Sequence, residues 1–316
     1  MEPIEKNVTN TTKKEPIKLV THDGSFHTDE VTATAVLRII FKDVEIIRTR
    51  DVKEIEKGDI VYDVGAKYDG KKFFDHHQRS FNSFFSENFD VKQSSAGLIF
   101  KHFHEKLFEE FGINLNNYSE LERKRIVDET YKAYFMGLDA IDNGDSRACP
   151  EIFVRNITSM VQSFNDTSSC QMKNFLRAVD FIEADLRLFF QKKIEYLNEI
   201  YPNTLEATKH LKDGIIISEE EKLCLRTLGK ICKEKEMNAK FIIFYKKHQK
   251  IFSIYGINFS ENFSQENLLK KEWRGLRNND LVDVCGIKGA VFVHASGFTG
   301  ANETLEGAIE MARQSF

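Results

Sequence analysis

The stretch that decides the fold is residues 18–41, K-L-V-T-H-D-G-S-F-H-T-D-E-V-T-A-T-A-V-L-R-I-I-F. Residues 18–21 predict a short strand, and residues 29–41 carry apolar side chains at helical spacing, with Thr28 or Asp29 as the expected N-cap. A polar turn that contains two histidines joins them. A strand followed directly by a helix is half of a βαβ unit, so this stretch predicts a parallel sheet.

The same alternation continues along the first half of the chain. Strands are expected at residues 44–49, 60–64 and 72–74, helices at 52–57 and 95–111, and two longer helical stretches at 121–140 and 171–200. A second α/β pattern follows: strand 215–218, helix 219–235, a hairpin of strands 241–245 and 251–257, strand 290–294 and a final helix 303–314. The predicted fold class is α/β, with a parallel-sheet domain and a second, smaller mixed-sheet α/β domain across a cleft.

The length of 316 residues is enough for two domains. The prediction is a flexible tail at residues 1–16, a metal-binding catalytic domain at 17–185, a helical linker at 186–204 and a substrate-binding α/β domain at 205–316.

Composition excludes several classes of protein. The 45 basic and 49 acidic residues give a net charge of −4, which excludes a globally basic protein that coats nucleic acid but leaves room for a local basic patch. No apolar run is long enough to span a membrane, and the polar N-terminal segment is neither a signal peptide nor an ordinary mitochondrial presequence. Five cysteines without a C-x-x-C pair favour a reducing, intracellular compartment and argue against a thiolate zinc site.

Histidines and aspartates gather where predicted strands end. His22, Asp63 and His76 each follow a predicted strand. Because the carboxyl ends of parallel strands share one edge of a sheet, we expect these side chains to converge there.

Such a cluster predicts a metal site. Neighbouring carboxylates repel one another unless cations lie between them. Imidazole and carboxylate together are ligands of Mn²⁺, Fe²⁺, Co²⁺ and Zn²⁺, and the absence of thiolates argues against structural zinc. Two ions roughly 3.5–4 Å apart can activate a water and clamp a phosphate for in-line attack.

Two segments near the C-terminus predict a phosphate-binding surface. Residues 270–277, K-K-E-W-R-G-L-R, combine basic side chains with Trp273, which is either a stacking face for a base or a core residue. Residues 294–300, H-A-S-G-F-T-G, are expected to join a strand to the last helix, where backbone amides and the helix N-terminus favour an anion.

Several segments, in this order along the chain, resemble the melanocyte-proliferating-gene family, formerly an uncharacterised protein family, of the DHH phosphoesterase superfamily. They are T-H-D-G-S-F-H-T-D-E, V-Y-D-V-G, D-H-H-Q-R-S-F, S-S-A-G-L-I-F, D-A-I-D-N-G, W-R-G-L-R and F-V-H-A-S-G-F-T-G. The resemblance covers residue 18 to the C-terminus. It implies a metal-dependent 3′–5′ RNA exonuclease of the nucleus, cytoplasm or mitochondrion.

The resemblance also implies roles for individual residues. The metal ligands would be His22, His27, Asp29, Asp63, His76 and Asp142. His77 would face the scissile phosphate and Asp75 would orient its neighbours. The substrate-binding residues would be Arg79, Arg274, Arg277, His294, Ser296 and Gly297. Two divalent ions are expected, with Mn²⁺ preferred and Mg²⁺, Co²⁺ or Zn²⁺ as alternatives.

This sequence departs from the superfamily pattern at three places. In the first motif a histidine replaces the first aspartate and the spacing is one residue longer, and the glycines of residues 294–300 are spaced differently. The fourth motif has helical spacing, so that Asp139 and Asp142 lie on one helical face and either could be the ligand. Asp142 is preferred because Asn-Gly follows it.

The expected substrate is single-stranded RNA or a short oligoribonucleotide, with no membrane partner; a homodimer is compatible with this interpretation. The first alternative is a small-molecule phosphoesterase or pyrophosphatase of the same superfamily, which the overall acidity favours. The second is a non-catalytic nucleotide- or RNA-binding module. A binding module does not require every metal-binding residue, yet in this sequence each motif position carries a residue that can bind a metal.

Overall fold

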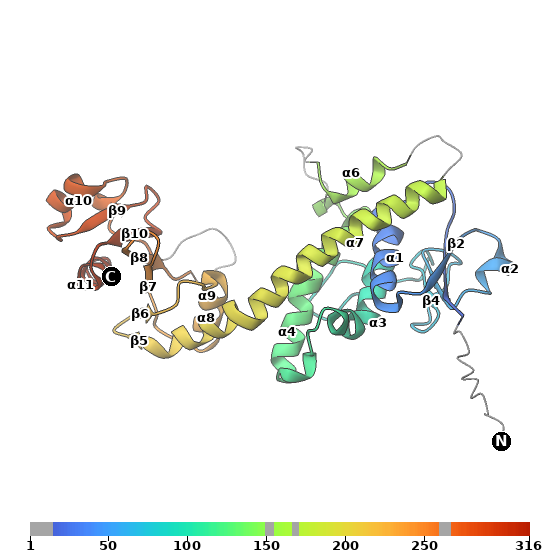
Figure 1. The fold of residues 1–316 in the computed structure, drawn as a ribbon, viewed down its shortest axis with the longest axis horizontal. Helices are drawn as coiled ribbons and strands as arrows, with labels where there is room; N and C mark the ends of the chain where they lie inside the picture. Colours follow the sequence, from blue (N-terminus) through green and yellow to red (C-terminus); the bar gives the residue numbers. More distant parts are fainter. Residues whose placement is uncertain (1–14, 149–154, 166–170, 259–266) are drawn as a thin grey trace, which may run out of the picture. The chain divides into compact units, whose positions relative to one another are not determined.

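The computed structural model describes residues 15–148, 155–165, 171–258 and 267–316. The chain divides into two compact units, Met1–Gln191 and Lys192–Phe316, and each is described by itself (Figure 1). The predicted tail lies almost wholly outside the described residues. The predicted linker, residues 186–204, falls on the end of α7 (Gln171–Glu195), the π-helical turn η4 (Tyr196–Ile200) and α8 (Tyr201–Ala207).

The first unit contains the predicted parallel sheet. Its strands are β1 (Ile17–Thr21), β2 (Val44–Arg48), β3 (Ile60–Tyr62) and β4 (Phe73–Phe74), in the order β2-β1-β3-β4, and every pair is parallel. The connections include α1 (Thr28–Phe41) and the short α2 (Val52–Ile55). The carboxyl ends of all four strands therefore lie along the same edge of the sheet.

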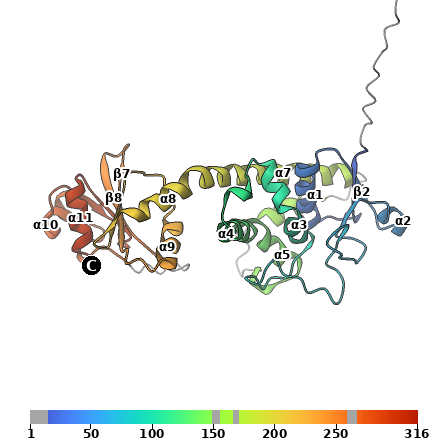
Figure 2. The same ribbon diagram turned by 90° about the horizontal axis from the view of Figure 1, so that it is seen from below.

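Helix α1 lies at the centre of this unit, packed against α3 (Ser95–Glu110). Val31, Ala33, Val36 and Leu37 are all 0% exposed. A helix that carries apolar or small side chains on every face is stable only when it is buried. The N-terminus of α1, which carries the acidic residues of the first motif, is therefore held inside the protein. Figures 1 and 2 show α1 and α3 side by side.

The helical stretch predicted at residues 121–140 is interrupted. It consists of α4 (Glu120–Thr130), a π-helical turn η2 (Tyr131–Phe135) and α5 (Met136–Asp142). Such a turn inserts one residue into the helix, and it is often found at functional sites. The remaining helices of the unit are η1 (Leu115–Asn117), η3 (Ser146–Ala148) and α6 (Ile157–Gln162).

The second unit is the predicted mixed-sheet α/β domain. Its strands lie in the order β5-β6-β7-β8-β10-β9, and among them only β6 and β7 pair in parallel. Their bounds are β5 Leu211–Lys212, β6 Ile215–Ser218, β7 Phe241–Lys246, β8 Ile251–Gly256, β9 Ala290–Val293 and β10 Thr299–Asn302. The helices are η5 (Thr208–His210), α9 (Leu225–Glu234), η6 (Lys271–Trp273), α10 (Asn278–Cys285) and α11 (Leu305–Arg313).

Both faces of this sheet are covered. Ile243 and Ile254 pack with α10 and α11, whereas Ile242, the neighbour of Ile243, packs with Leu228 and Cys232 of α9. Successive side chains of a strand point to opposite faces, so a continuous apolar strand such as β7 requires helices on both sides. The predicted hairpin of β7 and β8 is confirmed. No helix among the described residues combines the length and apolar character needed to cross a membrane.

Three details of the predicted elements are wrong. The N-cap of α1 is His27 rather than Thr28 or Asp29. The helix predicted from residue 219 begins only at Leu225. Residues 294–300 do not join a strand to the last helix, because β10 intervenes and pairs with both β8 and β9. The sequence T-G-A-N of β10 has no alternation of apolar and polar residues, so the sequence pattern did not predict a strand there.

Trp273 is a core residue, 2% exposed, within the cluster that covers one face of the second sheet. The alternative that it offers a free stacking face to a base is therefore wrong. Lys270 instead places its ammonium 5.2 Å from the centre of the Trp273 ring.

We expect Trp273→Ala to lower the free energy of unfolding by about 3–5 kcal/mol, because it removes a large buried side chain and leaves a cavity. Chemical denaturation followed by circular dichroism measures the change. Lys271→Ala, an exposed neighbour on η6, is the control and should change stability by less than about 0.5 kcal/mol. Equal stability of the two variants would contradict the core assignment.

Candidate metal centre

The turn between β1 and α1 is fixed by Glu30. Both carboxylate oxygens of Glu30 accept from the backbone N–H of His27 at 3.0 Å, as in a capping box. Glu30 Oε1 also lies 2.9 Å from His22 Nε2, and the Glu30 side chain is 0% exposed. One buried carboxylate therefore holds both ends of the histidine-containing turn.

Asp63 follows β3 in a strained backbone conformation. Its φ of +54° lies in the left-handed region that favours glycine, and such strain in a non-glycine residue is typical of functional sites. Asp63 Oδ2 lies 3.4 Å from His22 Nε2. Asp63 Oδ1 is buried and has no hydrogen-bond partner. His77 Nδ1 lies 3.5 Å from this oxygen, beyond a good hydrogen bond. A buried carboxylate oxygen without a hydrogen bond is costly unless a cation approaches it, so Asp63 fits a metal ligand.

The histidine pair after β4 lies on the other side of Asp63. His76 Nε2 is 3.1 Å from Asp142 Oδ2, and His76 Nδ1 is 3.9 Å from both Asp29 Oδ2 and Asp63 Oδ1. The side chain of His77 is 60% exposed, and its Nδ1 lies 2.7 Å from Asp75 Oδ1. The hydrogen bond to Asp75 raises the pKa of His77 above its usual value. The buried His76 and the exposed His77 therefore have different surroundings, although they are adjacent.

Asp75 is held by its neighbours. Its carboxylate accepts from the backbone N–H groups of Ala66 at 2.6 Å and His77 at 3.1 Å. Burial opposes ionisation of Asp75, but the hydrogen bonds from His77 and Ala66 outweigh it and lower the pKa. Asp75 is thus a carboxylate that orients the His77 ring, with Nε2 of His77 left for another partner.

The N-terminus of α3 binds two buried carboxylates. The backbone N–H groups of Ser95 and Ala96 donate to Asp29, while those of Ser94 and Gly97 donate to Asp139. Ser94 Oγ lies 2.6 Å from an oxygen of each aspartate. The unpaired N–H groups of a helix N-terminus favour negative charge, so α3 stabilises both carboxylates.

Asp139 and Asp142 of α5 have different positions. Asp139 is 0% exposed, and the Tyr131 hydroxyl at the start of the π-helical turn donates to its Oδ2 at 2.7 Å. Burial raises the pKa of Asp139 to about 7. Asp142 has a side chain that is 20% exposed and lines a cavity beside His76. The structure therefore places Asp142 among the candidate ligands, whereas Asp139 accepts hydrogen bonds from the N-terminus of α3.

Three overlapping groups of side chains could bind metal ions, because within each group one ligand atom per residue lies within 4.8 Å of the others. The groups are His22, His27, Glu30 and Asp63; Asp63, Asp75, His76 and His77; and Asp29, His76 and Asp142. Asp63 belongs to the first two groups and His76 to the last two. Every residue predicted as a metal ligand from the sequence is brought into this cluster.

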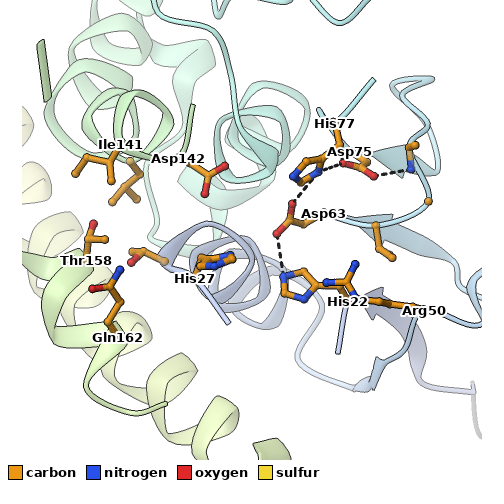
Figure 3. A pocket seen from close by; sticks show the side chains of 15 residues that line it. His22, His27, Arg50, Asp63, Asp75, His77, Ile141, Asp142, Thr158 and Gln162 are labelled. Atoms are coloured by element: carbon orange, nitrogen blue, oxygen red, sulfur yellow. Dashed lines mark hydrogen bonds and ion pairs between the residues drawn. The ribbon is translucent and has the colours of Figure 1, made fainter. Parts of the chain in front are cut away.

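The cluster opens into a cavity of about 600 Å³ (Figure 3). Its walls combine the candidate ligands with residues of α5, α6 and the segment after β2. The lining residues that the sequence analysis did not identify are Thr28, Arg50, Val64, Gly65, Ala66, Leu138, Ile141, Thr158 and Gln162.

Glu30 was also missed, although its position three residues after His27 is the capping-box position and could have indicated it. Thr158 and Gln162 carried no comparable signal, because only the fold brings α6 to this cavity.

The predicted substrate-binding residues lie in both units. Arg79, in the first unit, is exposed. In the second unit Arg274 Nε donates to the carbonyl of Leu269 at 3.0 Å. The guanidinium of Arg274 also lies against Gly297, where a Cβ would come within 2.5 Å of Arg274 Nε.

The other predicted residues of the second unit surround the β9–β10 turn. The guanidinium of Arg277 lies 5.6 Å from the centre of the Phe292 ring, and His294 Nδ1 lies 2.7 Å from Ser296 Oγ. The structure thus brings Arg274, His294, Ser296 and Gly297 together at the β9–β10 turn.

We expect Gly97→Ala to lower the free energy of unfolding by about 1–3 kcal/mol, because the added Cβ would lie 2.1 Å from Asp139 Oδ2. Gly137→Ala is the matched control: it is also helical, and a Cβ there meets nothing within 4 Å. A helix interior favours alanine over glycine by about 0.5–1 kcal/mol, so the control should be as stable as the parent or more so. Urea denaturation compares the two variants, and equal losses would contradict the packing argument.

The protonation of His22 is coupled to metal binding. Burial of His22 opposes its charged form, but hydrogen bonds to Asp63 and Glu30 outweigh it and raise the pKa of His22 to about 10. In the metal-free protein this pairing stabilises the fold below pH 6.5, and the stabilisation is lost as the pH rises towards 10. A histidine that binds a metal must be neutral, so Mn²⁺ binding at pH 7.5 should release at least the proton of His22.

Calorimetric titration with Mn²⁺ in buffers of different ionisation enthalpy measures the released protons. His22→Gln should release about one proton fewer than the parent protein, and the exposed His210→Gln should release as many as the parent. Mn²⁺ binding by the parent protein without proton release would show that His22 is not a ligand.

Comparison with known proteins extends over nearly the whole chain. A family model described as "Uncharacterised protein family (UPF0160)" matches residues 18–316. The MYG1 protein of Schizosaccharomyces pombe is 34% identical over 320 residues, which cover 95% of this chain and 97% of that protein. The MYG1 exonuclease of Homo sapiens is 32% identical over 328 residues, covering 94% of this chain and 85% of that protein.

A further relative, the MYG1 exonuclease of Mus musculus, is 30% identical over 325 residues, covering 94% of this chain and 84% of that protein. No solved structure matches the chain significantly. The family model and the relatives confirm the resemblance that the sequence motifs indicated. Because these matches extend along almost the entire sequence, the chain belongs to the uncharacterised protein family UPF0160, the family of the MYG1 proteins.

Proposed function

We propose that this chain is a metal-dependent phosphodiesterase that acts as a 3′–5′ exoribonuclease on single-stranded RNA or short oligoribonucleotides. The observation that carries the proposal is the cluster around Asp63, whose buried Oδ1 has no hydrogen-bond partner. The relatives named MYG1 exonuclease support a nuclease function. The family resemblance supports a place in the nucleus, cytoplasm or mitochondrion.

The donor set suits two divalent ions, of which Mn²⁺ is our choice because hard carboxylate oxygens are combined with imidazole. His22, His27 and Asp63 would hold one ion, with Glu30 beside them. The second would be held by Asp29, His76 and Asp142. Such ions, when bound, supply Lewis acidity that activates water and neutralises charge on the phosphate.

The protein itself contributes a positioned imidazole ring. The hydrogen bond from Nδ1 of His77 to Asp75 raises the pKa of His77 and directs Nε2 away from Asp75. A charged donor at this position forms a strong hydrogen bond to a phosphate oxygen. We assign His77 to the scissile phosphate and Asp75 to the orientation of the His77 ring.

The second unit is proposed to bind the rest of the strand. Arg274 and Arg277 are the cations of the second unit that would hold backbone phosphates, and Arg79 is the cation proposed for this role in the first unit. The β9–β10 turn, with His294, Ser296 and Gly297, adds small polar groups that a sugar–phosphate backbone can approach closely. Because the net charge is −4, binding depends on these local groups rather than on the overall field.

We expect Asp63→Asn to abolish Mn²⁺ binding at the site of His22, His27 and Asp63, and to lower the hydrolysis of a labelled oligoribonucleotide by about a thousandfold or more, since a charged ligand is replaced by a neutral amide. The fold should survive, because asparagine tolerates the left-handed conformation that residue 63 adopts. Mn²⁺ titration, activity and thermal unfolding are compared. Asp43→Asn, an exposed site in the same unit, is the control. A folded Asp63→Asn protein with full activity would refute the assignment.

The substrate class is tested by offering labelled oligoribonucleotide, pyrophosphate and a bisphosphate nucleotide in parallel, with Mn²⁺ and with chelator. We expect nucleoside monophosphates to be released from the oligoribonucleotide and the chelator to stop the reaction. Hydrolysis of pyrophosphate alone would establish the small-molecule alternative. Binding of Mn²⁺ and RNA without hydrolysis of any phosphoester would establish the binding-module alternative.

A further inference from the structure

The side chains that line the metal cavity differ in chemistry from one wall to the next (Figure 3). The candidate ligands lie in the middle. Arg50 lies beside His22 on one side, and Thr158 and Gln162 of α6 lie on the other, near Ile141 of α5. The cavity therefore has one cationic wall and one neutral wall.

The neutral wall combines polar and apolar groups. Thr158 and Gln162 are four residues apart on α6 and therefore lie on the same face of that helix. Neither the amide of Gln162 nor the hydroxyl of Thr158 forms a hydrogen bond within the described part of the chain. Leu138 and Ile141, three residues apart on α5, add apolar surface to the same cavity. An amide offers two donors and one acceptor, which suits the edge of a base or the hydroxyls of a ribose.

This wall is tied to the metal-binding turn. Asn165, which follows α6, accepts from the backbone N–H of Phe26 at 3.0 Å and donates to the carbonyl of Phe26 at 2.7 Å. The Phe26 ring is 1% exposed and meets Phe175 edge-on, with ring centres 5.5 Å apart. Because Phe26 lies between His22 and His27, the position of α6 is coupled to these ligands. Because the wall is already ordered, little conformational entropy is lost when a ligand binds to it.

The cationic wall depends on Arg50. Of the described residues that line the cavity, Arg50 is the one with a guanidinium or ammonium group. Its ion pair with Asp23 has an N–O distance of 3.3 Å, and both side chains are more than half exposed. Exposed pairs of this kind contribute little, so the guanidinium can exchange Asp23 for a phosphate.

Charge decides which part of a nucleotide lies at which wall. A phosphate group at the α6 wall would meet no cationic side chain among the described residues that form it, and would lie near the carboxylates of the cluster. A phosphate near Arg50 is neutralised by the guanidinium. A nucleoside carries no charge, and it combines an apolar ring face with polar edges, as the α6 wall does.

Building on the proposed function, we propose that Thr158, Gln162, Leu138 and Ile141 form the binding site for the nucleoside of the terminal nucleotide, and that Arg50 binds phosphate on the opposite wall. Gln162 and Thr158 hydrogen-bond the nucleoside, and the two apolar side chains contact it. Arg50 contributes to the binding of any phosphodiester, whereas the α6 wall contributes only when a nucleoside is present.

Kinetics with two substrates test this division. The hydrolysis of an oligoribonucleotide and of bis(p-nitrophenyl) phosphate, a phosphodiester without a nucleoside, is measured with Mn²⁺. The ratio of kcat/KM for the two substrates should fall at least tenfold in the double variant Thr158→Val, Gln162→Leu. The same ratio should change by less than twofold in Arg50→Gln, because this variant should lower kcat/KM for both substrates by the same factor. Ser163→Ala, next to Gln162 but outside this cavity, is the control and should match the parent protein.

Binding of products gives a readout that does not depend on turnover. Adenosine monophosphate and inorganic phosphate are titrated into the Mn²⁺-loaded protein. The affinity for adenosine monophosphate relative to phosphate should fall about tenfold in the double variant and stay constant in Arg50→Gln. A constant ratio in the double variant, in kinetics and in binding, would overturn the nucleoside site. A parent protein that hydrolyses neither substrate would refute the proposed function, while the two titrations would still decide the nucleoside site.

Discussion

The structure of the first unit depends on holding several carboxylates away from water at one edge of a sheet. Asp29, Glu30, Asp63 and Asp139 are each at most 5% exposed. Burial raises the pKa of Asp29, Glu30 and Asp139, and the charge of nearby carboxylates raises that of Asp29 further. Such groups are tolerated only where donors or cations compensate them.

The compensation comes from two sources. The N-terminus of α3 supplies backbone N–H groups to Asp29 and Asp139, and Gly97 allows the close approach. His22 supplies a protonated ring to Glu30 and Asp63. Asp63 Oδ1 is left without a hydrogen bond, and the nearest of its ion-pair contacts is His77 Nδ1 at 3.5 Å. This buried oxygen could therefore bind a cation.

The parallel sheet explains why residues from distant parts of the chain reach this site. β1, β3 and β4 end at the same edge, and the candidate ligands His22, Asp63 and His76 follow them directly. The helices then complete the cavity, with α5 contributing Asp142 and α6 contributing Thr158 and Gln162. Strand ends therefore provide three of the candidate ligands, while α1 and α5 provide Asp29 and Asp142 and helices also form the walls of the cavity.

The sequence by itself determined the class of fold, most of the elements and the residues that gather in the candidate metal cluster. These properties depend on local patterns: apolar periodicity specifies strands and helices, and polar residues directly after parallel strands must share an edge. Family-specific segments identified the family. The same patterns did not predict the role of Glu30, which depends on its hydrogen bond to the backbone N–H of His27. They also did not predict the strand β10, which forms because it pairs with β8 and β9.

Only the tertiary structure decided between residues that look alike in sequence. The sequence pattern places Asp139 and Asp142 on the same face of a helix. In the structure Asp139 faces the N-terminus of α3, whereas Asp142 faces the cavity. Trp273 had two equally reasonable roles until the packing of its ring showed it to be core. A carboxylate can face a cavity or accept hydrogen bonds inside the core, and an aromatic ring can be exposed or buried. Which of these occurs depends on the atoms of distant segments that pack against the side chain. Local sequence does not contain that information.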